Sequence, residues 1–79
     1  MKITFDPKHN IAYISFKEQT EEVNSIKISE DVVVDFSPDG SIYGIELLNA
    51  NEQINDIENG NFHLVNQLSG KSTKMESIS

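Results

Sequence analysis

The stretch VVVDFSPDGSIYGIELL, residues 32–48, decides the fold of this chain. Its three consecutive valines and the phenylalanine that follows are typical of a β-strand over 32–36. Ser37-Pro38-Asp39-Gly40 has proline at the second and glycine at the fourth position, which favours a type I turn. The resulting hairpin predicts that Val34 lies opposite Tyr43 and Val32 opposite Ile45, on one apolar face.

Two further hairpins are predicted before this stretch. Residues 2–5 and 11–16 are β-rich runs separated by the turn formers Asp6-Pro7-Lys8-His9-Asn10. A four-residue loop over 7–10 predicts the cross-strand pairs Phe5–Ala12 and Ile3–Ile14. A three-residue loop over 29–31 connects a strand over 23–28 to the valine strand and predicts the pairs Ile28–Val32, Ile26–Val34 and Asn24–Phe36. All three hairpins share one apolar face, which indicates a five-stranded antiparallel β-meander.

The hydrophobic period changes after Leu47. Apolar residues then recur at helical spacing, which predicts a helix over 50–58 that packs on one face of the sheet. Asn49 and Glu52 resemble a capping box, and Gly60 is expected to end the helix. Residues 61–68 fit either a strand or a helical turn, so an extra C-terminal element is left open. The expected class is α+β, with a single domain over 1–68 and a flexible tail over 69–79.

The composition excludes several classes of protein. Thirteen acidic residues against six lysines, with no arginine, give 79 residues a formal net charge of −7. This balance repels nucleic-acid backbones and anionic membranes, so neither is an expected partner. There is no apolar run long enough to span a membrane and no signal-peptide pattern, which predicts a cytoplasmic location. The absence of cysteine excludes disulfides, a thiol nucleophile and cysteine-based metal sites.

The second face of the predicted sheet is the candidate interface. It combines five apolar residues with several polar ones, too many for a wetted face and too few for a dry core. These candidate interface residues are Ile11, Tyr13, Val23, Val33 and Ile42. Because one short helix covers only one side of a sheet, we expect this face or an exposed edge strand to contact another subunit, by default in a homodimer.

Several segments resemble a known family. They are the opening MKITFDP, the strand Ala12-Tyr13-Ile14, Val33-Val34-Asp35-Phe36, Asp39-Gly40, and Gly44-Ile45-Glu46-Leu47-Leu48 followed by Asn49-Ala50. Together they resemble a small prokaryotic domain-of-unknown-function family, number 2283, over about residues 1–50. Asn10, Ala12 and Asp31 stand where that family commonly has Asp, Leu and Gly. Some relatives look like small genes beside candidate toxin genes, so the resemblance implies an antitoxin-like role by association only.

Catalytic and metal-binding patterns are weak in this sequence. Asp35 and Glu46 share the second face, where paired carboxylates can perform acid–base chemistry, but a solvated charge cluster with Lys27 is the simpler interpretation. His9 lies in a turn and His63 in the undecided C-terminal segment, and neither has a second histidine at helical spacing. No catalytic residue, metal ligand or cofactor is therefore predicted.

The sequence favours a non-enzymatic protein-interaction module. Its acidic charge suggests a basic protein as partner, in an antitoxin-like or inhibitor-like role. The alternative is a small-molecule or metal-dependent enzyme with a site at a homodimer interface, to which Asp35, Glu46 or His9 would contribute.

Overall fold

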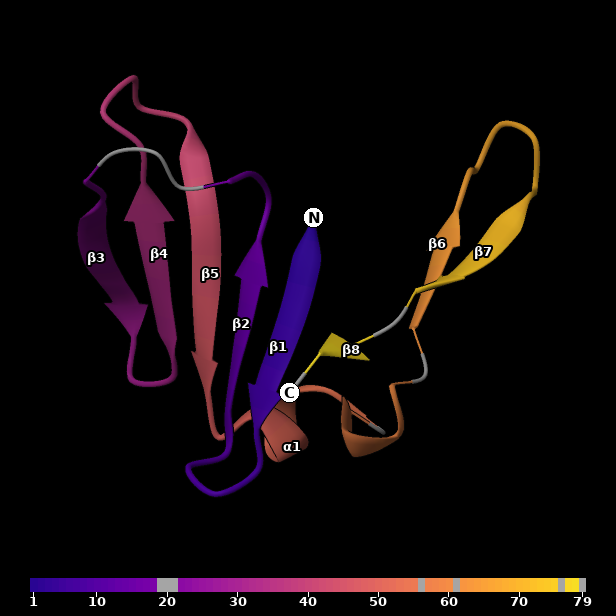
Figure 1. The fold of residues 1–79 in the computed structure, drawn as a ribbon, viewed down its shortest axis with the longest axis horizontal. Coiled ribbons are helices and arrows are strands. Elements are labelled where there is room, and N and C mark those ends of the chain that lie inside the picture. The colour runs from indigo at the N-terminus through magenta and orange to yellow at the C-terminus, as the bar shows by residue number, and fades with distance from the viewer. Residues whose placement is uncertain (19–21, 56, 61, 76, 79) are drawn as a thin grey trace.

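The chain forms one main sheet and a separate β-hairpin (Figure 1). The computed structural model describes residues 1–18, 22–55, 57–60, 62–75 and 77–78. Five antiparallel strands make up most of the sheet: β1 (Lys2–Asp6), β2 (Ile11–Ser15), β3 (Asn24–Ser29), β4 (Val32–Phe36) and β5 (Ile42–Leu48). A short strand, β8 (Ser77–Ile78), pairs in parallel with β1. The predicted five-stranded antiparallel sheet is confirmed.

The order of the strands differs from a meander. It is β3-β4-β5-β2-β1-β8, so that β2 pairs with β5 and not with β3. This pairing places Ile14 opposite Ile45 and Ala12 opposite Leu47, which extends the apolar face without a break. The connection between β2 and β3 is longer than a tight hairpin needs, and β3 therefore reaches the far edge of the sheet.

The two N-terminal registers follow the predictions closely. Between β1 and β2, Phe5 lies opposite Ala12 and Ile3 opposite Ile14. Between β3 and β4, the predicted pairs Ile26–Val34 and Asn24–Phe36 are also confirmed. The predicted Ile28–Val32 pair is wrong, because a bulge between Lys27 and Ser29 places Ser29 opposite Val32 and shortens the loop to two residues.

The predicted pairing of β4 with β5 is displaced by two residues. The turn itself forms where expected, with the Gly40 amide donating to the Ser37 carbonyl at 2.9 Å. However, Val34 lies opposite Ile45 and Val32 opposite Leu47. Two features contribute one residue each. The connection includes Ser41, so that Phe36 lies opposite Ile42, and a bulge between the Phe36–Ile42 and Asp35–Gly44 pairs leaves Tyr43 as an extra residue.

The helical segment is shorter than predicted. It consists of α1 (Ala50–Gln53) and the 3₁₀ turn η1 (Ile57–Asn59), because Ile54 has extended backbone angles that end α1. The predicted capping box is wrong. Asn49 has a left-handed backbone at φ 50° and makes no side-chain cap; its side-chain Nδ2 instead donates to the Asp31 carboxylate at 2.9 Å. Gly60, at φ 62°, follows η1 directly, as expected for a residue that ends a helical segment.

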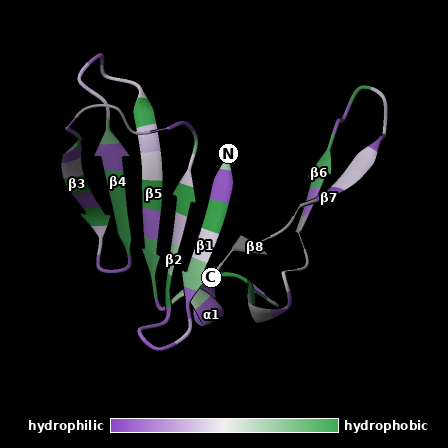
Figure 2. Cartoon of the chain, in the orientation of Figure 1, coloured by the Kyte–Doolittle hydropathy of each residue, from purple (hydrophilic) through white to green (hydrophobic). Residues whose placement is uncertain are grey.

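The core lies at one end of the apolar face. Phe5, Ala12, Ala50 and Ile57 are buried together, and Leu47 and Ile54 pack against them. α1 and η1 therefore cover the end of the sheet where β1 leads into β2 (Figure 1). Figure 2 shows that hydrophobic residues continue along the strands well beyond this covered end.

The C-terminal segment contains more regular structure than predicted. The undecided segment 61–68 provides β6 (Phe62–Val65), which pairs with β7 (Ser72–Met75). The predicted flexible tail over 69–79 contains β7 and β8. Two backbone hydrogen bonds close the turn between β6 and β7: the Asn66 amide donates to the Lys71 carbonyl at 2.8 Å, and the Gly70 amide donates to the Asn66 carbonyl at 2.7 Å. In the described part of the chain, no helix is long and apolar enough to cross a membrane.

Candidate functional site

The second face of the main sheet, which we call the mixed face, carries two cross-strand rows of polar and apolar side chains. One row contains Thr4, Tyr13, Glu46, Val33 and Lys27. The neighbouring row contains Lys2, Ser15, Gly44, Asp35 and Ser25. The strand order brings these residues together from five segments, which makes this face the first candidate site.

A hydrogen-bonded cluster joins the two rows. The Tyr13 hydroxyl donates to one carboxylate oxygen of Asp35 at 2.6 Å, and the Ser25 hydroxyl donates to the other at 2.6 Å. Burial, followed by this hydrogen bond to Asp35, raises the pKa of Tyr13 well above its ordinary value of 10.0. Each carboxylate oxygen of Asp35 thus accepts a hydrogen bond from a neutral hydroxyl. These two hydrogen bonds fix the side chains of Tyr13 and Ser25 in place.

Gly44 makes this cluster possible. A Cβ at Gly44 would lie 2.5 Å from the Tyr13 hydroxyl oxygen and 2.8 Å from the Ile14 carbonyl oxygen. Tyr13 therefore crosses the sheet directly above Gly44, from β2 over β5 to Asp35 on β4. Only a residue without a side chain leaves room for this crossing.

The five predicted interface residues do not share one face. Ile11, Tyr13 and Val33 lie on the mixed face, all half-buried. Ile42 is opposite Phe36 on the apolar face, because the bulge at Tyr43 reverses the expected side. The Tyr43 ring lies beside Tyr13, with their centroids 6.3 Å apart. The role of these residues in an interface stays a prediction.

Val23, the fifth predicted residue, lies beside the apolar face. It lines a pocket of about 430 Å³ together with Ile26, Phe36, Pro38 and Glu22. The pocket lies between the start of β3 and the Ser37–Gly40 turn. It joins apolar side chains to one acidic residue at the edge of the sheet.

The apolar face becomes more exposed with distance from the helix. In the row beneath α1 and η1, Phe5 and Ala12 are buried. In the middle row, Val34 is buried while Ile14 and Ile45 are half-buried. The far end consists of Phe16, Phe36 and Ile42, which we call the open apolar surface; Phe16 and Ile42 are each 43% exposed, and Phe36 is half-buried.

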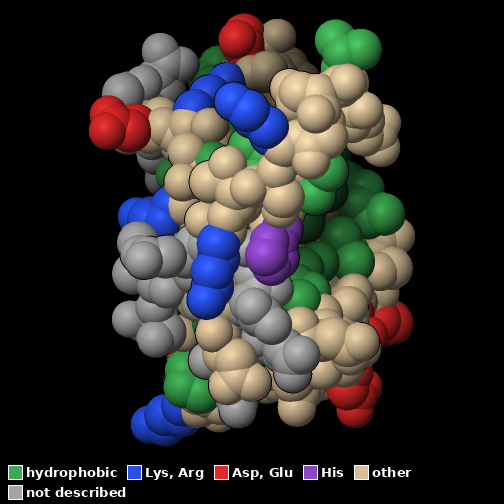
Figure 3. Space-filling model, turned by 90° about the vertical axis from the view of Figure 1, so that its right-hand side faces the viewer, with side chains coloured by type: hydrophobic (Ala, Val, Ile, Leu, Met, Phe, Trp, Pro, Cys, Tyr) green, Lys and Arg blue, Asp and Glu red, His purple; other side chains and the backbone are tan. Residues whose placement is uncertain are grey.

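The β6–β7 hairpin is the second place where apolar side chains meet solvent. Leu64, Val65 and Leu68 are exposed, and Leu68 almost completely so. In Figure 1 the hairpin extends away from the main sheet. Figure 3 shows the molecule from this side, where hydrophobic side chains gather in a hollow next to a histidine.

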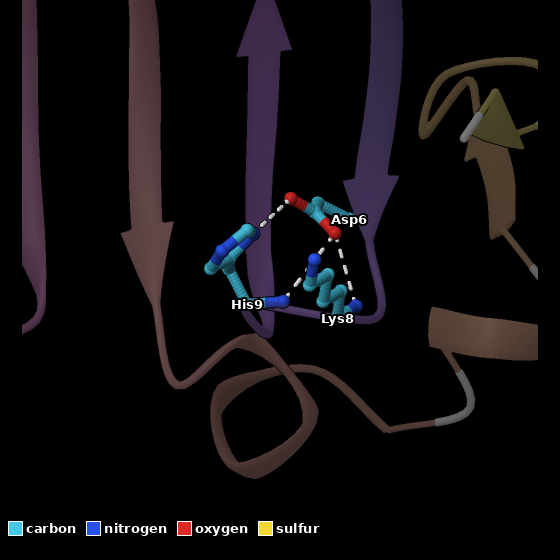
Figure 4. A network of polar contacts seen from close by, with 3 residues as sticks. All are labelled: Asp6, Lys8 and His9. Carbon is cyan, nitrogen blue, oxygen red and sulfur yellow. Dashed lines mark hydrogen bonds and ion pairs between the residues drawn. The ribbon is translucent and has the colours of Figure 1, made fainter.

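His9 is held in the turn between β1 and β2 (Figure 4). Its Nδ1 lies 2.7 Å from the Asp6 carboxylate, which also accepts the backbone amides of Lys8 and His9 at 2.9 and 3.3 Å. The hydrogen bond from His9 is the main reason that the pKa of Asp6 is lowered. This contact closes an Asx turn at the surface. Among the described residues, no group of three or more potential ligands could hold a metal ion.

An asparagine clamp fixes α1 to the end of the sheet. The Asn10 side chain donates to the Asn51 side chain at 2.5 Å and accepts the Asn51 backbone amide at 2.9 Å. The Asn10 carbonyl accepts the Ala50 amide at 3.0 Å, and Ala50 is fully buried. Asn10 therefore positions the start of the helix through Ala50 and Asn51, which is a structural role.

These features define a small acidic β-sheet protein with a short helical cap at one end and an open apolar surface at the other. The chain belongs to the family described as "Protein of unknown function (DUF2283)", whose family model matches residues 2–51. The matched region contains β1 to β5 and ends within α1. The comparisons found no match to the chain among curated proteins or among solved structures.

The sequence interpretation missed Phe16 and Phe36 as candidate surface residues. Both were assigned to the apolar face, which the helix was expected to cover. The available signal was length: a helix over 50–58 spans about 13 Å at 1.5 Å per residue, whereas five strands spaced about 4.8 Å apart are wider than that. The open apolar surface could therefore have been expected, although not its position.

Proposed function

We propose that this chain is a protein-interaction module that binds a basic protein through the open apolar surface, Phe16, Phe36 and Ile42. The observation that supports it is the unequal covering of the apolar face. Phe5 and Ala12 are buried beneath the helical segment, whereas Phe16 and Ile42 at the other end are 43% exposed. A contiguous exposed apolar patch on a small protein is typical of a binding surface.

Both the apolar side chains and the net charge favour such an interface. Complete burial of a side chain such as Phe or Ile contributes about 1.5–3 kcal/mol, so the partly exposed residues provide a share of this free energy. The formal charge of −7 attracts a basic partner and accelerates its association. Glu22 in the adjoining pocket offers a carboxylate beside the apolar side chains.

The most concrete form of this function is inhibitor-like or antitoxin-like. In that form the module covers a basic surface of its partner, and the apolar contacts fix the orientation of the complex. The family match adds no information on activity, because the family itself is described as of unknown function.

An enzyme with a site at a homodimer interface is supported less well. Asp35 is engaged by the Tyr13 and Ser25 hydroxyls, and His9 lies in a turn at the opposite end of the sheet from Asp35 (Figure 1). Glu46 lies on the same face as Asp35, but among the described residues no hydrogen bond joins the two side chains. The geometry therefore provides a structural cluster in place of a catalytic pair.

The test is capture of the partner from native lysate by the tagged chain and by two variants. Ile42→Asp places a charge in the open apolar surface, whereas Leu64→Asp places the same charge on an exposed apolar residue of the β6–β7 hairpin. We expect a stoichiometric basic protein with the native chain and with Leu64→Asp, and its loss with Ile42→Asp. Equal capture by both variants would exclude the open apolar surface as the binding site.

A further inference from the structure

β3 is an unpaired edge of the main sheet. In the described part of the chain, no strand lies beyond β3, and all six of its residues are exposed. The opposite edge differs, because β8 pairs with β1 there. An edge strand with free backbone N–H and C=O groups is a template for pairing with another chain.

The sequence of β3 favours one register for pairing with a copy of itself. When a two-fold axis perpendicular to the sheet relates two antiparallel copies of β3, the same face of each copy lies on the same side of the sheet. The axis must then pass midway between a residue and its own copy. An axis at Lys27 would place two lysines directly opposite each other, which is repulsive. An axis at Ile26 places Ile26 against its copy and Lys27 opposite Ser25.

This register also provides charge complementarity. Ser25, on β3, lies directly opposite Asp35 of β4 in the cross-strand row, and its hydroxyl donates to Asp35 at 2.6 Å. The Lys27 of the second copy would continue the same row, with its Cα about 10 Å from that of Asp35, within reach of a lysine side chain. Within one copy, Lys27 forms an ion pair with the highly exposed Glu30, at 3.7 Å.

The bulge after Lys27 limits the length of the pairing. Asn24 would lie opposite Ile28, which is the extra residue of the bulge, so the regular pairing cannot extend further. The contact thus joins five residues from each copy and buries Ile26 and Ile28, which are 51% and 60% exposed. A two-fold contact of this kind closes on itself as a dimer.

We propose that two copies of this chain pair through β3, antiparallel and centred on Ile26, with Lys27 of each copy against Asp35 of the other. The inference goes beyond the proposed function and does not depend on it, because it concerns the edge of the sheet and not the open apolar surface. The two sheets become one continuous sheet, and the two open apolar surfaces lie on the same side of it.

A cysteine substitution tests the register, because the sequence contains no cysteine. Directly opposite Cα atoms in an antiparallel pair are about 4.5–5.5 Å apart, within the range of a disulfide. Under mild oxidation, Ile26→Cys is expected to form a covalent dimer, whereas the control Ser29→Cys, at another exposed position of β3, is expected to stay unlinked. Equal cross-linking of the two variants would overturn the proposed register.

Sedimentation equilibrium of the native chain and of Lys27→Glu tests the charge contact. We expect a monomer–dimer equilibrium for the native chain, and a dissociation constant at least about tenfold higher for Lys27→Glu. A native chain that stays monomeric would overturn the pairing. Capture of the basic partner by Lys27→Glu separates the two proposals, since that variant leaves the open apolar surface intact.

Discussion

Gly44 determines how the side chains of Tyr13 and Asp35 meet on the mixed face. Tyr13, Gly44 and Asp35 belong to three different strands, and Tyr13 reaches Asp35 only because Gly44 leaves the surface between them free. The sequence marked Tyr13 as an interface residue and Asp35 as a carboxylate that Glu46 accompanies. Their contact could not be predicted, because it requires β2 to pair with β5, which is a non-local choice.

Replacing Gly44 by alanine tests this packing. Gly44→Ala is expected to lower the free energy of unfolding by about 1–3 kcal/mol, because the new methyl group collides with Tyr13 and with the Ile14 carbonyl. Urea denaturation measures the change. Alanine ordinarily stabilises an open strand position relative to glycine, so an unchanged or raised stability would contradict the proposed crossing.

The titration of Tyr13 provides a second test at this scale. Burial and the Asp35 hydrogen bond raise its pKa above 10.0 in the folded protein. The associated stabilisation is therefore fully present below pH 10 and is lost as the pH rises through the folded pKa. Ultraviolet absorbance of tyrosinate should show delayed ionisation that disappears in Tyr13→Phe and moves to lower pH in Asp35→Asn. Identical titration curves for the native chain and Asp35→Asn would argue against the hydrogen bond.

The individual elements were predictable where the contacts are local. The β1–β2 hairpin joins neighbouring runs through a turn with strong local signals, so its register follows from the sequence. β4 and β5 were predicted as strands, but a connection longer by one residue and the bulge at Tyr43 together shift their register by two residues. A bulge depends on the balance between turn geometry and side-chain packing across three strands, which periodicity does not contain.

For the helical segment, the sequence predicted the buried residues but not the hydrogen bonds at its start. Its apolar spacing was recognised, and Ala50 and Ile57 are buried as that spacing requires. The capping prediction was wrong because Asn49 has a left-handed backbone and donates to Asp31, a partner that the fold brings from another loop. Long-range hydrogen bonds to Asn10 and Asp31 thus replace local capping.

The asparagine clamp leads to a prediction at the scale of this element. Asn10 has φ 56° and bonds to Asn51 through its side chain. Asn10→Gly keeps the favourable backbone but loses the side-chain bonds, whereas Asn10→Ala loses both. We expect both variants to be destabilised, and Asn10→Ala by about 1 kcal/mol more, in urea denaturation. Equal stabilities of Asn10→Gly and the native chain would show that the clamp contributes nothing.

The whole molecule has a covered end and an open end. The helical segment packs on the end row of the apolar face, where Phe5 and Ala12 are buried, whereas Phe16 and Ile42 in the far row are exposed. The sequence established the existence of an apolar face and its residues from alternation alone. It did not reveal which end the helix covers, because that depends on the strand order and on the clamp at Asn10.

The open apolar surface is the central claim at this scale. Once the basic partner has been captured, titration calorimetry measures its affinity for the native chain and for Ile42→Asp, which tests this claim directly. We expect an affinity at least about tenfold lower for Ile42→Asp, and weaker binding of the native chain as salt is raised, because charges of opposite sign steer the complex. Equal affinities of the native chain and Ile42→Asp would contradict the assignment of this surface to binding.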